Sequence, residues 1–549
     1  MNRTIHPRAG QKLASHELIT RKQMRDLYGK KRAKTDKVKN GTSGHRGKAG
    51  AGFNRSQVAS MTQALVDIRN ERGTYGPDVL SHLKGKPAGS VVVGHDVRAL
   101  SDFARVTTIG VLAANGVTSI VDIDGRAVPT PVVSRRIING NKQAESGTEG
   151  IIVTASHNAP DNGGIKSNGQ DGGPNTRTAQ IDERSNQLLP NASEIAQVSM
   201  EEAVAAGLVV TEDLQGQYVA ELPLVVNIEA VREGRFAATS LGGSAHGYYE
   251  RINAEHGTNI VELLAQPDPA GANRTIDHDG VHRGDPSSPY VMKAVDGMRK
   301  EHNVPFVGAN DNDADRFGGE DSTGILNPNH ILSVVFHHLA TTRGFDQSMG
   351  IGRTIGTSHM LDAIANSLGR PVHEVNVGFK YYVKGLVEGR YVLAGEESAG
   401  FSVPQMDGST WVTEKDGIVA VLLMMEIIAS TGKDIGTLYG ELVAKHGTFN
   451  YDRVDSPATD AKKKRLKALA SDPAEVHRLL DGKKVNGRDI ERMVIGDGIK
   501  VVLKGGIWVL KRPSGTEPII KDYQEAHDQP LGVAAKASEE LDALLGLPS

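Results

Sequence analysis

Ser90-Val-Val-Val-Gly94 is the stretch of sequence that decides the fold class. A short β-branched run of this kind is typical of a strand that is buried on both faces of a sheet. A helical stretch follows at Phe103–Ala114, Gly116 ends it, and Thr118–Ile123 supplies the next strand. This order of strand, helix and strand favours a parallel sheet, and Gly150–Thr154 repeats the strand signal, so we predict an α/β fold.

Two further α/β units are predicted downstream, starting at about residue 205. The second unit has Leu224–Ile228 as a possible strand, Glu229–Arg232 as the start of a helix, and Pro305–Gly308 as a strand that runs into an Asp-rich loop. The third unit is predicted from an apolar helix beginning at Ile418 and from three strand signals, at Gly350–Thr354, Val372–Val375 and Tyr391–Ala394.

The last portion of the chain, from about Asp455, has a different pattern. A Lys-rich helix at Ala461–Ala470 precedes two strands, Ile499–Leu503 and Gly506–Leu510, which form a hairpin-like pair. We therefore predict that this portion is α+β rather than doubly wound. We expect four domains, at residues 1–205, 206–325, 326–455 and 456–549, which suits 549 residues at roughly 150 per domain.

The composition excludes several classes of protein. Sixty-three basic and 66 acidic side chains leave a formal charge of −3, so no global field favours nucleic acid or anionic lipid. The absence of cysteine excludes disulfides, thiolate catalysis and sulfur-ligated zinc. The N-terminal sequence lacks a secretory apolar region, and the longest apolar run, Ile418–Ile428, is about half the roughly 20 residues of a membrane span. We expect a soluble, cytoplasmic protein with no nucleic-acid or membrane partner.

An acidic loop brings Asp311, Asp313 and Asp315 together. Alternate side chains of an extended loop share one side, so these carboxylates would repel one another without a cation between them. A hard divalent ion that prefers oxygen ligands, Mg²⁺ first, suits this set. An EF-hand calcium loop is excluded, because counting from Asp311 puts Arg316 at position six and Ser322 at position twelve. The alternative is a solvated turn after a strand.

Ser156 lies immediately after the strand signal Gly150–Thr154. The carboxyl end of a parallel strand is where α/β folds place reactive groups, so Ser156 is a candidate nucleophile. Lys166 is within reach of the same loop. His157 is the next residue, but adjacency alone does not make a hydrolase-type Ser–His pair. The alternative for a lone serine is a hydroxyl that caps a turn.

Two glycine-rich segments have the composition of ligand-binding loops. Gly41–Lys48 combines glycines with Arg46 and Lys48 and suits an anion, although it lacks the residues of a Walker A loop. Gly395–Gly400 offers two carboxylates and a hydroxyl to a polyol, and Glu396 occupies the position where a nucleophile elbow requires glycine. A flexible loop and a surface turn are the respective alternatives.

A fifth segment, Arg512–Pro518, has the composition of a phosphate site. Arg512 supplies a planar bidentate cation, Ser514 and Thr516 supply hydroxyl donors, and Gly515 leaves the backbone open. The alternative is a plain Pro-Ser-Gly turn.

Together these motifs resemble the α-D-phosphohexomutase superfamily, and within it the bacterial glucose-specific phosphoglucomutases, from Gly41 to Pro518 and in the family's order. The metal loop of the family usually has glycine where this chain has Asn312, but the three carboxylates and Arg316 are retained. The matching loops are the phosphoserine loop at Thr154–Asn158, the metal loop at Asp311–Arg316, the sugar loop at Gly395–Gly400 and the phosphate loop at Arg512–Thr516.

The resemblance implies a fold and a reaction. The fold would have four domains around a central cleft, three similar α/β domains and a smaller α+β C-terminal domain. Phosphorylated Ser156 would give its phosphoryl group to glucose 1-phosphate, and the resulting glucose 1,6-bisphosphate would return its other phosphate and leave glucose 6-phosphate. One Mg²⁺ per chain would be held by Asp311, Asp313, Asp315 and an oxygen of phosphorylated Ser156.

The resemblance also implies roles for the other candidate residues. His157 and Lys166 are alternatives for the general base, and Arg46 would support the transition state. Glu397 resembles the glucose-type members, because mannose- and glucosamine-type members tend to differ there. Substrate contacts are implied for residues of the metal, sugar and phosphate loops and for one further cation, namely Arg316, Glu396, Ser398, Arg512, Ser514, Gly515, Thr516 and Lys415.

Three other functions stay open at this level. A phosphomannomutase-type hexomutase would use the same motifs, and a metal-dependent sugar phosphatase would also use Ser156 and the Asp loop. A non-enzymatic sugar-phosphate sensor would bind the same ligands without a phosphoryl group on Ser156. The expected partners are small-molecule sugar phosphates, and the chain is expected to be a monomer or a homodimer.

Overall fold

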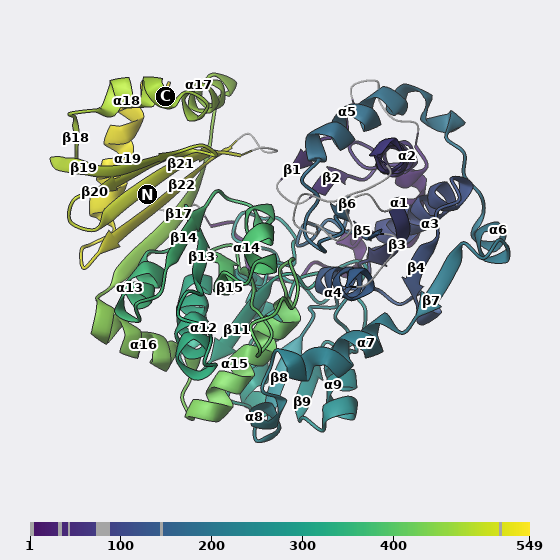
Figure 1. The fold of residues 1–549 in the computed structure, drawn as a ribbon, viewed down its shortest axis with the longest axis horizontal. Coiled ribbons are helices and arrows are strands. Elements are labelled where there is room, and N and C mark those ends of the chain that lie inside the picture. Colours follow the sequence, from purple (N-terminus) through teal and green to yellow (C-terminus); the bar gives the residue numbers. More distant parts are fainter. Residues whose placement is uncertain are drawn as a thin grey trace.

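The computed structural model describes residues 5–30, 36–41, 44–72, 88–142, 147–514 and 519–548. These residues form an α/β protein with three mixed sheets followed by an antiparallel sheet (Figure 1). We call the residues around each sheet the first, second, third and fourth units, in chain order. In Figure 1 the first unit lies at the right, the fourth at the upper left, and the second and third below them. The predicted fold class is confirmed.

The first sheet has the strand order β1-β2-β6-β5-β3-β4-β7. Strands β5, β3, β4 and β7 are parallel, and β6 returns antiparallel beside β5. The strands are β1 (Asn40–Gly41), β2 (Gly44–Lys48), β3 (Ala88–His95), β4 (Ser119–Asp122), β5 (Gly147–Val153), β6 (Asn162–Asn168) and β7 (Val209–Glu212). The helices are α1 (Arg21–Tyr28), α2 (Arg55–Arg72), α3 (Ala99–Ala114), α4 (Thr130–Asn141), α5 (Thr178–Leu188) and α6 (Met200–Ala205).

The second and third sheets repeat this plan with parallel strands and antiparallel ends. The second sheet runs β12 (Gly324–Ile325), β11 (Phe317–Asp321), β10 (Val307–Asn310), β8 (Phe236–Thr239) and β9 (Ile260–Leu263). The third runs β14 (Val372–Val375), β13 (Gly350–Thr354), β15 (Tyr391–Glu396) and β16 (Gly400–Ser402). Helices of the second unit are α7 (Leu214–Glu221), α8 (Ile228–Arg232), α9 (Tyr248–His256), α10 (Pro289–Met292) and α11 (Met298–Glu301). Those of the third are α12 (Pro328–Thr342), α13 (Met360–Ser367), α14 (Val383–Val387), α15 (Gly417–Thr431) and α16 (Ile435–His446).

The fourth sheet is antiparallel throughout, as expected for the α+β portion. It runs β17 (Phe449–Pro457), β22 (Ile519–His527), β21 (Ile507–Pro513), β20 (Ile499–Leu503), β19 (Arg488–Ile495) and β18 (Lys484–Val485). Helices α17 (Asp460–Ala470) and α19 (Gly532–Leu544) contact β21, and α18 (Pro473–Leu480) packs on α17. The hairpin predicted from two apolar runs is the β20–β21 pair.

The segment Leu224–Ile228 is not a strand, so that prediction is wrong. Pro223 lies in a 3₁₀ turn at Leu222–Leu224, which follows α7 directly, so the apolar run begins in a turn rather than in an extended segment. Asn227 then caps α8, because its side-chain oxygen accepts a hydrogen bond from Ala230 N at 3.3 Å. A short apolar run that packs into the core as a turn and the start of a helix cannot be told from a buried strand by its periodicity.

The apolar run Ile418–Ile428 lies within α15, which is buried over most of its length. Although α15 follows the third sheet in sequence, it packs against β10, β11 and α8 of the second unit. Its internal charge, Glu426, accepts hydrogen bonds from Arg343 at 2.7 Å and from Asn227 N at 2.8 Å. One continuous core joins the first three units around this helix. Within the described ranges, no helix is both long and apolar enough to cross a bilayer.

The proposed domain boundaries at residues 205, 325 and 455 stay a prediction. Strand β7 begins after residue 205 but pairs with β4 of the first sheet. Strand β17 spans residue 455 and pairs along its length with β22 of the fourth sheet. Sheet pairing therefore favours placing the first boundary after β7 and the last before β17.

The fourth sheet has one face against its own helices and the other against the third unit. Trp508 and Tyr523 pack around Ile355, and Tyr451 Oη donates to Gly356 O at 2.9 Å. Lys500 is fully buried at this contact. Lys500 Nζ contacts Glu374 (Oε2 at 3.2 Å), His359 (Nε2 at 2.9 Å) and the ring of Trp508 (centroid at 4.2 Å), and the charges of Arg353 and Asp362 also act on it.

Replacement of Lys500 by methionine is expected to change how stability depends on pH. Burial, followed by the charge of Arg353, lowers the pKa of Lys500 to about 7 from 10.5. Between these values the unfolded chain binds a proton that the folded chain does not, so this contribution to the free energy of unfolding rises with pH. The free energy of unfolding of the wild type, relative to that of Lys500→Met, should therefore rise by up to about 1.4 kcal/mol per pH unit between pH 7 and pH 10.

Denaturant titrations followed by tryptophan fluorescence would measure this difference, since Lys500 lies beside Trp508. The matched control is Lys504→Met, which removes an exposed lysine from the turn after β20. A stability difference between wild type and Lys500→Met that stays constant over this pH range would contradict the prediction.

Candidate active site

Ser156 lies directly after β5, in the loop that joins β5 to β6. Its Oγ donates a hydrogen bond to Asp311 Oδ2 at 3.0 Å, and His157 Nδ1 lies 3.3 Å from the same Oγ. The Ser156 backbone is left-handed, with φ +52°, which is uncommon for a residue other than glycine. On the opposite side of the loop, a Cβ at Gly164 would approach Thr154 O to 2.3 Å, so only glycine fits there. The sequence motif at 154–158 and the acidic loop 155 residues away thus meet at one hydroxyl.

The phosphoserine-loop motif is held by residues at the end of β3, which the sequence interpretation missed. Asp96 accepts hydrogen bonds from Thr154 Oγ1 at 2.7 Å and from Ser101 Oγ at 2.6 Å. Thr154 Oγ1 in turn accepts from Ser156 N at 2.8 Å. Arg98 Nη2 donates to Ser156 O at 2.6 Å. The signal that could have found Asp96 and Arg98 was their position directly after a parallel strand.

The three carboxylates of the acidic loop converge, as the spacing predicted, but through a turn rather than an extended segment. Ala314 is left-handed, with φ +52°, and this bend turns Asp315 back toward Asp311 and Asp313. All three side chains are buried, and one oxygen of each lies within 4.8 Å of the others. Thr130 Oγ1 from the first unit also donates to Asp313 Oδ2, at 2.8 Å.

Two lysines oppose this negative charge. Lys166 Nζ lies 2.6 Å from both Asp313 Oδ2 and Asp315 Oδ2, and Lys415 Nζ lies 3.0 Å from Asp315 Oδ2. Burial works against ionisation of Lys166, but Asp313 and Asp315 outweigh it and raise its pKa above the usual range. For Asp315, burial is outweighed by Lys166 and Lys415, so its pKa is lowered. Asp311 bonds to Ser156 instead, and burial together with the charges of Asp313 and Asp315 raises its pKa well above the ordinary value.

The carboxylate cluster fits a hard divalent cation. Asp313 Oδ1 and Asp315 Oδ1 are buried and have no hydrogen-bond partner among the described residues. A buried carboxylate oxygen without a partner is costly, and an oxygen-preferring ion such as Mg²⁺ would satisfy it. Three carboxylates against two lysines also leave a net negative charge for such an ion to neutralise. This buried group could therefore hold a metal.

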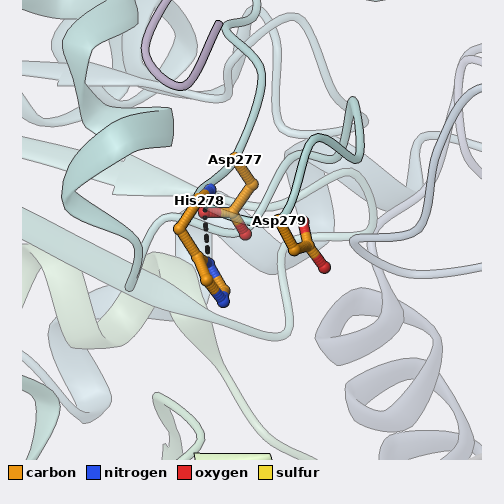
Figure 2. A group of neighbouring side chains, drawn as sticks. All are labelled: Asp277, His278 and Asp279. Atoms are coloured by element: carbon orange, nitrogen blue, oxygen red, sulfur yellow. Dashed lines mark hydrogen bonds and ion pairs between the residues drawn. The ribbon is translucent and has the colours of Figure 1, made fainter. Parts of the chain in front are cut away.

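A second group of possible metal ligands, Asp277, His278 and Asp279, lies in a loop of the second unit (Figure 2). Protein donors already engage it. His278 Nδ1 lies 3.0 Å from Asp277 Oδ1, which also accepts from Ser288 Oγ at 2.5 Å. Arg283 pairs with both carboxylates. We assign no metal to this group.

Three further predicted residues surround the serine and the acidic loop. Arg46 on β2 is half-buried, and its Nη1 lies 3.4 Å from Asn158 Oδ1. Arg316 donates its backbone N–H to Asp311 Oδ1 at 3.2 Å, and its guanidinium pairs with Asp285 at 3.0 Å. Burial and the charges of Arg316 and Arg46 lower the pKa of His157 well below 6.5. The site therefore combines a carboxylate cluster with a rim of cations.

The sugar loop joins β15 to β16 in the third unit. Glu396 is buried, accepts from Gly378 N at 3.1 Å and from Ser398 Oγ at 3.2 Å, and its pKa is raised by burial. Glu397 is oriented by two threonine hydroxyls, Thr354 Oγ1 at 3.0 Å and Thr357 Oγ1 at 3.1 Å. Phe317 N, directly after the metal loop, donates to Ala399 O at 3.0 Å, which places the sugar loop beside the metal loop.

The phosphate loop joins β21 to β22 in the fourth unit. Arg512 Nε donates to Asp497 Oδ2 at 2.5 Å, and Ser514 is buried, with its backbone N–H bonded to Ile519 O at 3.0 Å. Gly515 and Thr516 lie outside the described residues. Lys521 on β22 is among the cations whose charge lowers the pKa of His157, so the fourth unit contributes to the electrostatics of the site.

Three loops of the site share one topology. Each leads from a parallel strand into the antiparallel strand that follows it, at β5–β6, β10–β11 and β15–β16. Each contains one residue other than glycine in the left-handed region, namely Ser156 (φ +52°), Ala314 (φ +52°) and Ala399 (φ +66°). Conformations of this kind cost roughly 1–3 kcal/mol and persist where the surrounding structure enforces them.

Comparison with known proteins agrees with this arrangement. Residues 37–189 match the family model for phosphoglucomutase/phosphomannomutase, alpha/beta/alpha domain I, and residues 327–446 match domain III of the same family. A phosphoglucomutase of Komagataeibacter xylinus is 34% identical, over 99% of this chain and 98% of its own length.

Solved structures share the fold. A phosphoglucomutase of Paramecium, parafusin, aligns with a TM-score of 0.69 at 22% identity, over 93% of this chain and 95% of its own. A phosphoglucomutase/phosphomannomutase family protein of Burkholderia thailandensis aligns with a TM-score of 0.65 at 21% identity, over 93% and 96% of the two chains. The four-unit architecture is thus that of the phosphohexomutases, and with the full-length similarity above it shows that the chain belongs to the phosphoglucomutase/phosphomannomutase family and is a phosphohexomutase, an isomerase.

Proposed function

We propose that this phosphohexomutase is a phosphoglucomutase, which interconverts α-D-glucose 1-phosphate and glucose 6-phosphate through a phosphoserine at Ser156. The observation that carries the proposal is the hydrogen bond from Ser156 Oγ to Asp311, which sets a hydroxyl at the edge of a buried carboxylate cluster. A full-length relative named phosphoglucomutase, 34% identical, supports glucose as the sugar. Glucose 1,6-bisphosphate would be the intermediate.

The reaction would proceed in two balanced halves. The C6 hydroxyl oxygen of glucose 1-phosphate attacks the phosphorus of phosphorylated Ser156, the bond from phosphorus to Oγ breaks, and the hydroxyl proton passes through a basic group of the site to the freed Oγ. After the bisphosphate turns over, Ser156 Oγ attacks the phosphorus of the group on C1, the bond from phosphorus to the C1 oxygen breaks, and the serine proton passes through the basic group to that oxygen as glucose 6-phosphate leaves. Of the two candidate basic groups, His157, 3.3 Å from Oγ, is favoured, because Asp313 and Asp315 raise the pKa of Lys166 and keep it protonated. Arg46 would neutralise charge on the transferring phosphoryl.

The acidic loop would hold one Mg²⁺ per chain, with Asp311, Asp313, Asp315 and an oxygen of phosphorylated Ser156 as ligands. When bound, this ion would neutralise the charge that develops on the transferring group. The chain's own lysines, Lys166 and Lys415, would keep the carboxylates ionised and oriented.

Substrate recognition would use loops of the other units. Glu396 and Ser398 would accept and donate hydrogen bonds at sugar hydroxyls, with Lys415 and Arg316 beside them. The phosphate that is not reacting would bind to Arg512 and Ser514, together with Gly515 and Thr516. A small cavity lined by Gly44, Lys166, Asn168, Lys380 and Glu414, among others, lies between the first and third units.

The proposal predicts a preference for glucose 1-phosphate over mannose 1-phosphate of at least about tenfold in kcat/KM, since hydrogen bonds that one epimer satisfies are left unmade by the other. NMR of both substrates with Mg²⁺ would measure it, with intact-mass analysis to detect the phosphoryl group on Ser156. Glu397→Gln, which keeps the shape of a side chain held by Thr354 and Thr357, is expected to narrow this preference.

Each alternative gives a different result in the same experiment. Equal or better turnover of mannose 1-phosphate would favour a phosphomannomutase. Stoichiometric release of inorganic phosphate would indicate a phosphatase, and binding without phosphorylation of Ser156 would indicate a sensor.

A further inference from the structure

The carbonyl oxygen of Ser156 accepts two hydrogen bonds from side chains of different units. Arg98 Nη2 of the first unit and Asn312 Nδ2 of the second each lie 2.6 Å from this oxygen. Both side chains are buried. Neither side chain lies in the motif loops' ligand sets, yet both converge on the backbone of the proposed nucleophile.

Arg98 spans the turn that carries the serine. The same Nη2 that bonds to Ser156 O also donates to Asn158 O at 2.5 Å, so one nitrogen ties the two ends of the turn together. Arg98 N donates a hydrogen bond to Asp96 Oδ1 at 3.0 Å. Asp96 also accepts a hydrogen bond from Thr154 Oγ1, and Thr154 Oγ1 in turn accepts one from Ser156 N. One network anchored at Asp96 therefore fixes both the N–H and the C=O of Ser156.

Asn312 donates the second hydrogen bond to the Ser156 carbonyl, and in the sequence it stands between two proposed metal ligands. The metal loops of the family that this chain resembles usually have glycine at this position, and glycine has no side chain that could make this hydrogen bond. The backbone oxygen of Asn312 accepts from Ser244 N at 2.8 Å, which holds the peptide in the second unit. Its Oδ1 is buried and has no partner within the described part of the chain, so the hydrogen bond to Ser156 is the side chain's polar contact there.

These contacts act where the backbone is strained. Ser156 has φ +52°, a conformation that a free serine rarely adopts. If the carbonyl were released, the peptide could relax, and Oγ would turn away from Asp311, 3.0 Å distant. A nucleophile that both receives and returns a phosphoryl group must occupy the same position in both halves of the reaction.

We propose that Arg98 and Asn312 are positioning residues that clamp the Ser156 carbonyl and aim its Oγ at the carboxylate cluster. The proposal rests on the proposed function, since it assumes that Ser156 carries the phosphoryl group. The hydrogen bond from Asn312 also links Ser156 to the metal loop, so that residues of both the first and the second unit fix the position of Ser156.

The test compares donor-free and donor-retaining variants of the full chain. Arg98→Met is expected to lower kcat by about 100-fold, the loss that a displacement of about 1 Å can cause. Asn312→Gly and Asn312→Ala, which remove one of the two donors, should lower it about tenfold. KM for glucose 1-phosphate should stay within about threefold, because neither side chain belongs to the sugar or phosphate loops. Arg98→Lys should recover most of kcat, since a single nitrogen bridges both carbonyls.

Matched controls separate positioning from stability. Arg370 also donates to backbone carbonyls, at Asp346 O (2.7 Å) and Met349 O (2.8 Å), but outside the site. Asn141 likewise donates to Thr148 O at 2.8 Å. Arg370→Met and Asn141→Ala should lower the melting temperature and leave kcat per folded molecule unchanged.

The proposal would be overturned if Asn312→Gly and Arg98→Met kept kcat within about threefold of wild type at equal phosphoserine content, or if KM rose in step with the loss of kcat. It would also be overturned if the two controls lost as much kcat as the site variants. A wild type that forms no glucose 6-phosphate would instead refute the proposed function itself, which keeps the two failures distinct.

Discussion

Ser156→Ala is expected to lower the isomerisation of glucose 1-phosphate by at least about 10⁴-fold, because no other group in the site can replace a covalent nucleophile. Its Oγ is the atom that bonds to Asp311 at 3.0 Å, and deleting one oxygen leaves no cavity larger than a water. Fold and sugar-phosphate binding should therefore survive. A coupled assay for glucose 6-phosphate measures the loss, and isothermal titration with glucose 1-phosphate measures the retained binding.

The control for this variant is Ser185→Ala. Ser185 is also buried, but its Oγ donates to Ile181 O at 2.6 Å within α5, away from the site. It should keep full activity and show no change in the phosphoryl group detected by intact mass. Substantial turnover by Ser156→Ala, or a phosphoryl group still present on that variant, would show that another residue carries the phosphoryl.

Removal of divalent cations by EDTA should lower activity by about 10³-fold, and Mg²⁺ should restore it, because the metal supplies several kcal/mol of charge stabilisation. The reason lies in the cluster of Asp311, Asp313 and Asp315, whose negative charge exceeds that of its two lysines. A readout independent of turnover is available. Mg²⁺ at about 100 times its Kd should raise the free energy of unfolding by about 2.7 kcal/mol, measured as a shift in melting temperature.

Two variants assign this effect to a site. Asp313→Asn should abolish the Mg²⁺-dependent shift in melting temperature, since it removes a charge that also binds Lys166. Asp279→Asn, from the exposed part of the second acidic group (Figure 2), should keep both the shift and the activity. If the Mg²⁺-dependent shift survives in Asp313→Asn but is lost in Asp279→Asn, the metal binds to the second acidic group and not to the acidic loop.

Much of the fold could be predicted from local patterns. The segments Gly350–Thr354, Val372–Val375 and Ile499–Leu503 are strands with the predicted bounds, since each is a short segment with β-branched residues between turn or loop residues. The buried helix around Ile418–Ile428 was predicted from its apolar length alone. The prediction of a strand at Leu224–Ile228 was wrong, because the same apolar content also suits a turn and a capped helix.

The parts that could not be predicted depend on contacts between distant residues. The pairing of Arg98 with the Ser156 carbonyl joins residues 58 positions apart, and no motif marks it. Lys500 alternates with apolar residues in β20, a pattern that predicts a solvent-facing side chain. The third unit covers that face of the sheet instead and buries the lysine. The roles of the four loops came from the family resemblance, while the convergence of the serine, metal and sugar loops required the fold.

The left-handed residues Ser156, Ala314 and Ala399 have a consequence for the origin of the chain. One bend recurs at the equivalent crossing of three sheets, in loops whose side chains differ from one another. This is the pattern that duplication of a single ancestral module would leave, with the hairpin inherited and its side chains free to diverge. Segments 147–168, 307–321 and 391–402 are accordingly where traces of that shared descent should be sought, rather than in the surrounding helices.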